Sequence, residues 1–68
     1  MEHYNLIITE ENSGKRIDRF LSEYFSDYSR SFFQKLIKEK QILVNQKEIK
    51  SNYKLNTDDM MEITIPDP

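Results

Sequence analysis

The spacing of the apolar residues predicts two short helices. In residues 15–25 and again in residues 30–40, apolar side chains recur three and four positions apart, which places them on one face of a helix. The two faces consist of Ile17, Phe20, Leu21, Tyr24 and Phe25, and of Phe32, Phe33, Leu36 and Ile37. Ser29 is well placed to cap the second helix, because its hydroxyl can accept a hydrogen bond from an early backbone N–H.

The other apolar segments are short and predict strands. We expect these strands at residues 4–9, 42–44, 47–49 and 60–65. A tight turn at residues 45–46 would join the middle two as a hairpin. In the last segment, alternation directs Met61, Ile63 and Ile65 inward. The polar loop 51–59 is expected to return Tyr53 and Leu55 to the core.

These elements fit one α+β domain that occupies residues 1–68. Two helices, at about 15–25 and 30–40, would pack on one face of a small mixed or antiparallel sheet. A chain of this size buries only about 60% of the surface that its unfolded form exposes, so its stability should be modest. Pro66-Asp67-Pro68 resembles the first residues of a linker.

The composition removes several classes of function. There is no cysteine, so disulfides and thiolate metal sites are excluded, and the lone His3 sits near the start of the chain. No apolar run approaches the roughly 20 residues that span a membrane, and no signal peptide is visible. We therefore expect a cytoplasmic protein with no membrane, no metal and no small-molecule cofactor.

No catalytic constellation is visible in the sequence. Neither Ser29 nor Ser31 has a histidine near it, and we interpret Asp58-Asp59 as a turn before a strand and not as an acid–base pair. A single glycine cannot build a phosphate-binding loop. We assign no catalytic and no metal-ligating residue.

Charge is segregated along the chain. All ten Lys and Arg residues lie between Lys15 and Lys54, where five acids leave a balance of about +5, and the two tails carry the other seven acids. A chain with a net charge of −2 can thus present a one-sided cationic surface to a polyanion. The alternative that charge alone leaves open is a solvated helix face.

The cations also fall on the polar half of the second helix. At 100° per residue, this half carries Arg30, Ser31, Gln34, Lys35 and Lys38. Further cations follow at Lys40, Lys47, Lys50 and Lys54. Such an array contacts phosphates, whereas Ser31, Gln34 and Asn45 offer hydrogen bonds to RNA shape or 2′-hydroxyls. We expect that reversing the charge of Arg30 and Lys38 together abolishes RNA binding and leaves the fold intact.

Four segments in order resemble the S-four RNA-binding domain, also called the αL motif. They are Gly14–Leu21 (GKRIDRFL), Tyr28–Ser31 (YSRS), Leu36–Asn45 (LIKEKQILVN) and Leu55–Asp59 (LNTDD). The resemblance implies RNA contacts at Arg16, Arg30, Ser31, Gln34, Lys35, Lys38, Lys40, Asn45 and Lys47. For Arg16, pairing with Asp18 or a loop acid is the open alternative. It also implies a core of Ile17, Leu21, Leu36, Ile37, Ile42, Val44, Met61 and Ile63.

Three residues stand where that family usually has glycine, namely Lys40, Gln46 and Asp58. The resemblance implies positive φ at these positions, at a cost of roughly 1 kcal/mol for each and least for Asp58. The alternative is that the turns are remodelled.

Residues 25–31 (FSDYSRS), after a leading strand, resemble the N-terminal domain of RluD-like ribosomal large-subunit pseudouridine synthases. The resemblance implies a bacterial-type RNA-binding module that recognises structured large-subunit ribosomal RNA and is not itself catalytic. The catalytic domain of that isomerase would be tethered beyond the linker and is absent from this chain. The alternatives are a stand-alone ribosome-associated RNA-binding factor and a protein–protein interaction domain.

Overall fold

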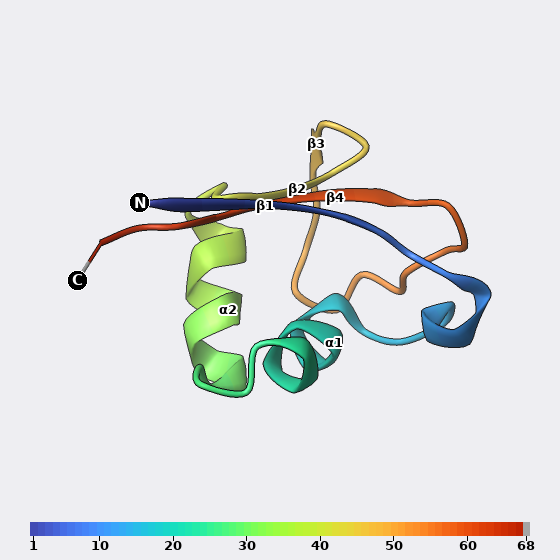
Figure 1. Ribbon diagram of the computed structural model, residues 1–68, viewed down its shortest axis with the longest axis horizontal. Helices are drawn as coiled ribbons and strands as arrows, with labels where there is room; N and C mark the ends of the chain where they lie inside the picture. The colour runs from blue at the N-terminus through green and yellow to red at the C-terminus, as the bar shows by residue number, and fades with distance from the viewer. Residues whose placement is uncertain (68) are drawn as a thin grey trace.

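The computed structural model describes residues 1–67 and confirms the α+β architecture. The elements are β1 (Glu2–Ile7), a one-turn 3₁₀ helix (Glu10–Asn12), α1 (Ile17–Tyr24), α2 (Arg30–Lys38), β2 (Ile42–Val44), β3 (Lys47–Glu48) and β4 (Met60–Ile65). The strands form one antiparallel sheet in the order β1-β4-β2-β3, and both helices lie under one face of it (Figure 1). Pro68, the last residue of the expected linker segment, lies outside the described residues.

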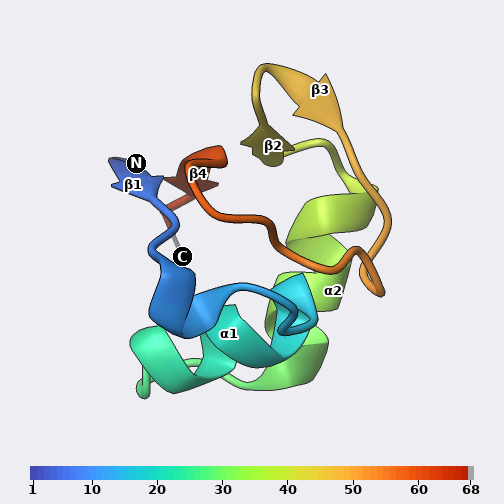
Figure 2. The same ribbon diagram turned by 90° about the vertical axis from the view of Figure 1, so that its right-hand side faces the viewer.

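The core fills the space between the sheet and the two helices (Figure 2). In the sheet, Ile63 of β4 lies between Tyr4 of β1 and Ile42 of β2, so the inward rows of three strands meet. The buried apolar residues are Ile8, Ile17, Phe20, Leu21, Phe33, Leu36, Ile37, Ile42, Val44, Leu55, Met61, Ile63 and Ile65. They include every residue that the family resemblance placed in the core.

The apolar stripes of both helices are less deeply buried than expected. Tyr24, which the spacing placed on the apolar stripe of α1, is 55% exposed. It lies in the last turn of α1, where the neighbouring rings of Phe20 and Phe25 cover it only in part. Phe25 and Phe32 are half-buried at the edge of the core. The helices therefore bury a narrower stripe than the spacing suggested.

α1 begins two residues later than expected because the preceding segment bonds to a loop. The Gly14 N–H donates to the Leu55 carbonyl (2.7 Å), and the Leu55 N–H donates to the Lys15 carbonyl (2.9 Å). The Ile17 N–H then donates to the Tyr53 carbonyl (2.8 Å). These bonds fix the entry to α1 and hold the loop that follows β3 beside it.

The backbone has positive φ at the three positions where the S-four family usually has glycine. Lys40 has a φ of 64°, Gln46 of 65° and Asp58 of 72°, so the expectation at all three positions is confirmed. α2 ends at Lys38, two residues before the predicted end, and Lys40 follows it with positive φ. Asn45, with a φ of 53°, and Gln46 together form the two-residue turn between Val44 and Lys47, which is typical of a type I′ hairpin.

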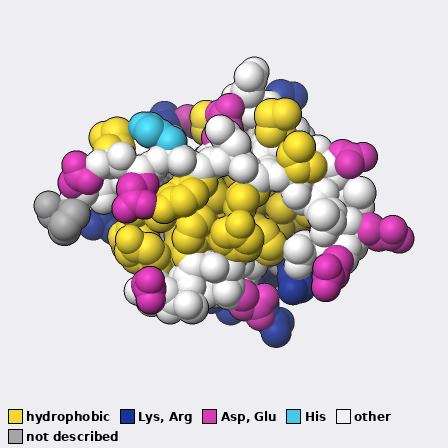
Figure 3. Space-filling model, in the orientation of Figure 1, with side chains coloured by type: hydrophobic (Ala, Val, Ile, Leu, Met, Phe, Trp, Pro, Cys, Tyr) yellow, Lys and Arg dark blue, Asp and Glu magenta, His cyan; other side chains and the backbone are white. Residues whose placement is uncertain are grey.

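Apolar and acidic side chains gather on the side of β1. Figure 3 shows a hydrophobic patch at the centre of this face, with acidic side chains around it and Lys and Arg only at its margins. At the same side, Tyr4 of β1 packs edge-on against Phe25 with ring centroids 5.0 Å apart. The two ends of the chain also meet here, because Glu2 pairs with Ile65 and the Met1 ammonium forms an ion pair with Asp67.

Candidate nucleic-acid interface

A buried carboxylate joins the beginnings of the two helices. Asp18, in the first turn of α1, has a fully buried side chain. It accepts hydrogen bonds from Arg16 (Nε, 3.2 Å, and Nη2, 3.1 Å), from Arg30 Nε (3.1 Å) and from Gln34 Nε2 (2.9 Å). The backbone N–H of Arg19 donates the fifth bond (2.8 Å). We call Asp18 and its three side-chain donors the Asp18 network.

Local sequence explains why these side chains meet. Ser29 caps α2, since its hydroxyl oxygen accepts from the Phe32 N–H at 3.1 Å, as the sequence predicted. Arg30 is therefore the first residue of α2, and Gln34 lies one turn later on the same side of the helix. Arg16 immediately precedes α1, and its side chain donates to the same carboxylate from just before that helix.

The network keeps Asp18 ionised. Burial by itself raises the pKa of Asp18, but the hydrogen bonds from Gln34, Arg30, Arg16 and the Arg19 amide together lower it below its ordinary value. The charged carboxylate in turn orients the two guanidinium groups. Both arginine side chains remain 44% exposed, so each is held in place while part of it still faces solvent.

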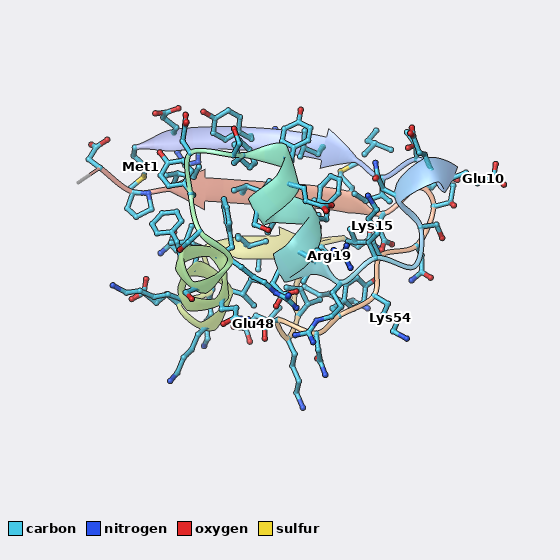
Figure 4. The ribbon with its side chains drawn as sticks, turned by 90° about the horizontal axis from the view of Figure 1, so that it is seen from below. Met1, Glu10, Lys15, Arg19, Glu48 and Lys54 are labelled. Carbon is cyan, nitrogen blue, oxygen red and sulfur yellow. The ribbon has the colours of Figure 1, made fainter. Side chains whose placement is uncertain are left out.

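A hollow of about 730 Å³ lies next to the Asp18 network, between the second half of α2 and the segment that follows β3. Four cations line this hollow, namely Arg16, Lys38, Lys40 and Lys50. Seen from below, Glu48 and Lys54 lie on the side of the molecule away from β1 (Figure 4). We call the hollow the basic groove.

The structure brings some of the predicted contact residues together and leaves others apart. Arg16, Gln34, Lys38 and Lys40 line the basic groove, and Arg30 adjoins it through Asp18. Arg16 pairs with Asp18, as the alternative expectation had it, and it also lines the groove, while its contact with RNA stays a prediction. Ser31 and Lys35 are exposed on α2 but do not line the groove.

The two RNA contacts predicted in the hairpin between β2 and β3 do not line the basic groove. The turn between β2 and β3 projects to the side of the sheet opposite the helices (Figure 1), and Lys47 follows directly after it. The amide of Asn45 is already engaged, because its oxygen accepts from the Met60 N–H (3.0 Å) and its NH₂ donates to Asp59 (3.0 Å). RNA contact at Asn45 and Lys47 stays a prediction.

Asp59 organises the loop before β4. Its buried carboxylate accepts from the Tyr53 hydroxyl (2.7 Å), the Asn56 N–H (2.9 Å) and Asn45. Burial raises the pKa of Asp59, but these hydrogen bonds outweigh it and lower the pKa below its usual value. The hydrogen bond that the Tyr53 hydroxyl donates to Asp59 also raises the pKa of Tyr53. The Asp58-Asp59 pair thus has the turn role that the sequence suggested.

Sequence reasoning missed the role of Asp18 and several groove residues. In the sequence, Asp18 was considered as a possible partner of Arg16, and not as a buried centre that also binds Arg30 and Gln34. Its position gave a signal, however, because it lies three residues before Leu21 and therefore beside the apolar stripe. Glu48, Ser51 and Asn52 line the groove but carry no recognisable spacing in the sequence.

Other kinds of site find no support in the part of the chain that is described. Among residues 1–67, no three His, Asp or Glu side chains are grouped in a way that would hold a metal ion. Neither described helix is long and apolar enough to cross a membrane.

Comparison with known proteins points to one family. The family model of the S4 domain matches residues 15–61. An uncharacterized RNA pseudouridine synthase of Bacillus subtilis, YlyB, shows 35% identity in an alignment that covers the whole of this chain and 22% of that protein. The ribosomal large subunit pseudouridine synthase C of Vibrio parahaemolyticus shows 36% identity in an alignment that covers 82% of this chain and 18% of that protein. An uncharacterized RNA pseudouridine synthase of Aquifex aeolicus also shows 36% identity, in an alignment that covers 85% of this chain and 19% of that protein. The chain spans about a fifth of the length of these relatives.

Proposed function

The chain belongs to the S4 domain family, and we propose that it is the RNA-binding module of a ribosomal RNA pseudouridine synthase. In this proposal it holds structured large-subunit ribosomal RNA in the cytoplasm for a tethered catalytic domain and performs no catalysis itself. The names of the relatives from Vibrio parahaemolyticus and Bacillus subtilis support the enzyme class. The observation that carries the RNA-binding role is the concentration of cations around the basic groove, beside the Asp18 network.

The arrangement suits a phosphate backbone. Lys38 of α2 and Lys50 after β3 line the same hollow, and neither has a carboxylate partner within ion-pair distance in residues 1–67. Each can therefore approach a phosphate as a point charge. Arg16 and Arg30 keep an exposed part and are already oriented by Asp18, so less side-chain entropy is lost when they bind.

The expected affinity is modest and sensitive to salt. Three to five phosphate contacts give a slope of log affinity against log salt of about −2 to −4. Such contacts hold an RNA in place but carry little sequence information. A module of this kind adds affinity to a larger protein, whereas the choice of uridine would belong to the catalytic domain.

Charge removal in the groove tests the proposal. We expect Lys38→Gln with Lys50→Gln to weaken binding of a labelled hairpin from large-subunit ribosomal RNA by about tenfold or more, and to flatten the salt slope by about 1 to 2. Fluorescence anisotropy across a salt series measures both. The matched control is Thr9→Glu with Ser26→Glu, which changes the net charge equally at exposed sites outside the groove.

Two results would count against the proposal. If the unmodified chain bound no RNA at low salt, a protein–protein interaction domain would replace it. If the control pair weakened binding as much as the groove pair, net charge and not the groove would govern binding. The tethered enzyme is tested separately by reading the coding sequence beyond codon 68, where a stop codon would favour a stand-alone ribosome-associated factor.

A further inference from the structure

The basic groove is not lined by cations alone. The half-buried Ile49 also lines the hollow with apolar surface, as does Ile37 of α2 with the 5% of it that is exposed. A phosphate pressed against these side chains would lose hydration without gaining a hydrogen bond there, which is unfavourable. The walls instead suit a group with apolar faces.

The groove also contains a carboxylate. Glu48 lines it and forms an ion pair with Lys40 at 3.1 Å. The two side chains are 59% and 69% exposed, so this pair is weakly held in water. A carboxylate repels a phosphate, but it accepts hydrogen bonds from the amino groups of nucleobases. The exposed Asn52 and half-buried Ser51 in the same lining add donors and acceptors.

Size and surroundings match the same ligand. A volume of about 730 Å³ lies within the range of clefts that bind small molecules, roughly 300 to 1,000 Å³. Arg16, Lys38 and Lys50 around the hollow can hold the phosphates on either side of an inserted group. The lining therefore combines apolar walls for a planar ring, polar groups for its edge and cations for its backbone.

We propose that the basic groove receives one unpaired nucleobase of the bound RNA. The inference rests on the proposed function and deepens it, since it names an unpaired nucleotide, such as a bulge, as the feature recognised. A base inside a duplex offers neither its faces nor its pairing edge, whereas a base splayed from a bulge or loop offers both. Ile49 contacts one face of the base, with the exposed part of Ile37 beside it, and Glu48, Ser51 and Asn52 hydrogen-bond its edge.

A pair of RNAs tests this inference. Two labelled hairpins share one sequence, except that one carries a single unpaired cytidine in its stem. We expect the bulged hairpin to bind about tenfold tighter, because the inserted base adds contacts that a paired base cannot make. The two salt slopes should agree, since the phosphate contacts are the same. An unpaired 2-aminopurine at the bulge should change its fluorescence when the protein binds.

A variant separates base contact from phosphate contact. Ser51→Ala with Asn52→Ala should remove most of the preference for the bulge and leave binding to the fully paired hairpin unchanged. Ser26→Ala with Asn5→Ala is the matched control at exposed sites outside the groove, and circular dichroism confirms that each variant folds.

The outcomes distinguish the two proposals. Failure of both hairpins to bind at low salt would overturn the proposed function together with this inference. Equal affinity for the two hairpins, or a bulge preference that survives in the Ser51 and Asn52 variant, would overturn the base site alone.

Discussion

At the residue scale, Asp18 determines how the cations are arranged. It is an acidic residue on the inner edge of α1, and it accepts hydrogen bonds from two side chains of α2 and from the arginine that precedes α1. A charge with a fully buried side chain is tolerated only when it is paired and hydrogen-bonded, and no buried side-chain N or O atom in residues 1–67 lacks a partner. The carboxylate thereby links the stability of the helix pair to the geometry of the basic groove.

Replacement of this carboxylate should therefore affect both properties. We expect Asp18→Asn to lower the free energy of unfolding by about 2 to 3 kcal/mol, since hydrogen bonds to a charged group are lost in a buried site. Urea denaturation measures the change. Glu23→Gln is the control, because Glu23 is 49% exposed and its pairs with Lys15 and Arg19 lie in solvent. If the two substitutions cost the same, Asp18 has no special role.

The same pair of proteins should differ in acid. The folded state lowers the pKa of Asp18, so its stabilisation is complete above the unfolded value near 4 and is lost as the pH falls through the lower folded value. The stability gap between the wild type and Asp18→Asn should be widest near neutral pH and should close below pH 4. Thermal denaturation from pH 7 to pH 2.5 measures it. A gap that stayed constant would contradict the ionised network.

The Asp18 network also changes one expectation from the sequence. The joint reversal of Arg30 and Lys38 was expected to spare the fold. In the structure, Arg30 Nε donates to Asp18, so Arg30→Glu would place two carboxylates together at a buried site. Loss of RNA binding in that variant would not separate fold from contact. Sequence periodicity placed Arg30 on the exposed face, but it could not show a partner twelve residues away on another helix.

At the scale of elements, the hairpin between β2 and β3 carries avoidable strain. Asn45 and Gln46 both have positive φ, and a two-residue turn of this type favours Asn followed by Gly. The penalty falls on Gln46, because a side chain beyond Cβ is disfavoured in the left-handed region. β3 has only two residues, so this turn contributes much of what holds it.

Glycine at the second turn position should therefore stabilise the protein. We expect Gln46→Gly to raise the free energy of unfolding by up to about 1 kcal/mol. Chemical denaturation measures the gain. The control is Gln41→Gly, at a half-buried position where φ is not positive, which should destabilise the chain because glycine there only adds unfolded-state entropy. Loss of stability in Gln46→Gly would show that the glutamine side chain makes a contact of its own.

Elements were predictable where their signals were local. The cap at Ser29, the alternation in β4 and the helical spacing around Leu36 each depend on neighbours within a few residues. The start of α1 was misjudged because the loop around Leu55 competes for its backbone groups. The strand order β1-β4-β2-β3 could not be derived, since β1 and β4 pair across almost the whole chain.

At the scale of the molecule, folding places the acidic ends of the sequence and its basic middle on two different sides of the domain. The tails, which carry acids and no Lys or Arg, include the paired strands β1 and β4, while the basic middle supplies α2 and the groove. An overall net charge of −2 therefore conceals a local positive field, which attracts an anion over about 10 Å at moderate salt. The one-sided distribution was predictable from sequence, but its centre at a hollow was not.

Because Met1 and Asp67 are in contact, the two ends of the chain can be joined and the chain can begin at another residue. A short glycine–serine bridge between these ends, with a new opening between the exposed Ser26 and Asp27, would give a circular permutant. We expect it to fold with a slightly lower melting temperature and to bind the RNA hairpin with unchanged affinity, as circular dichroism and anisotropy would show. The domain could then also be inserted into a surface loop of a host protein, as a cassette whose two attachment points sit side by side.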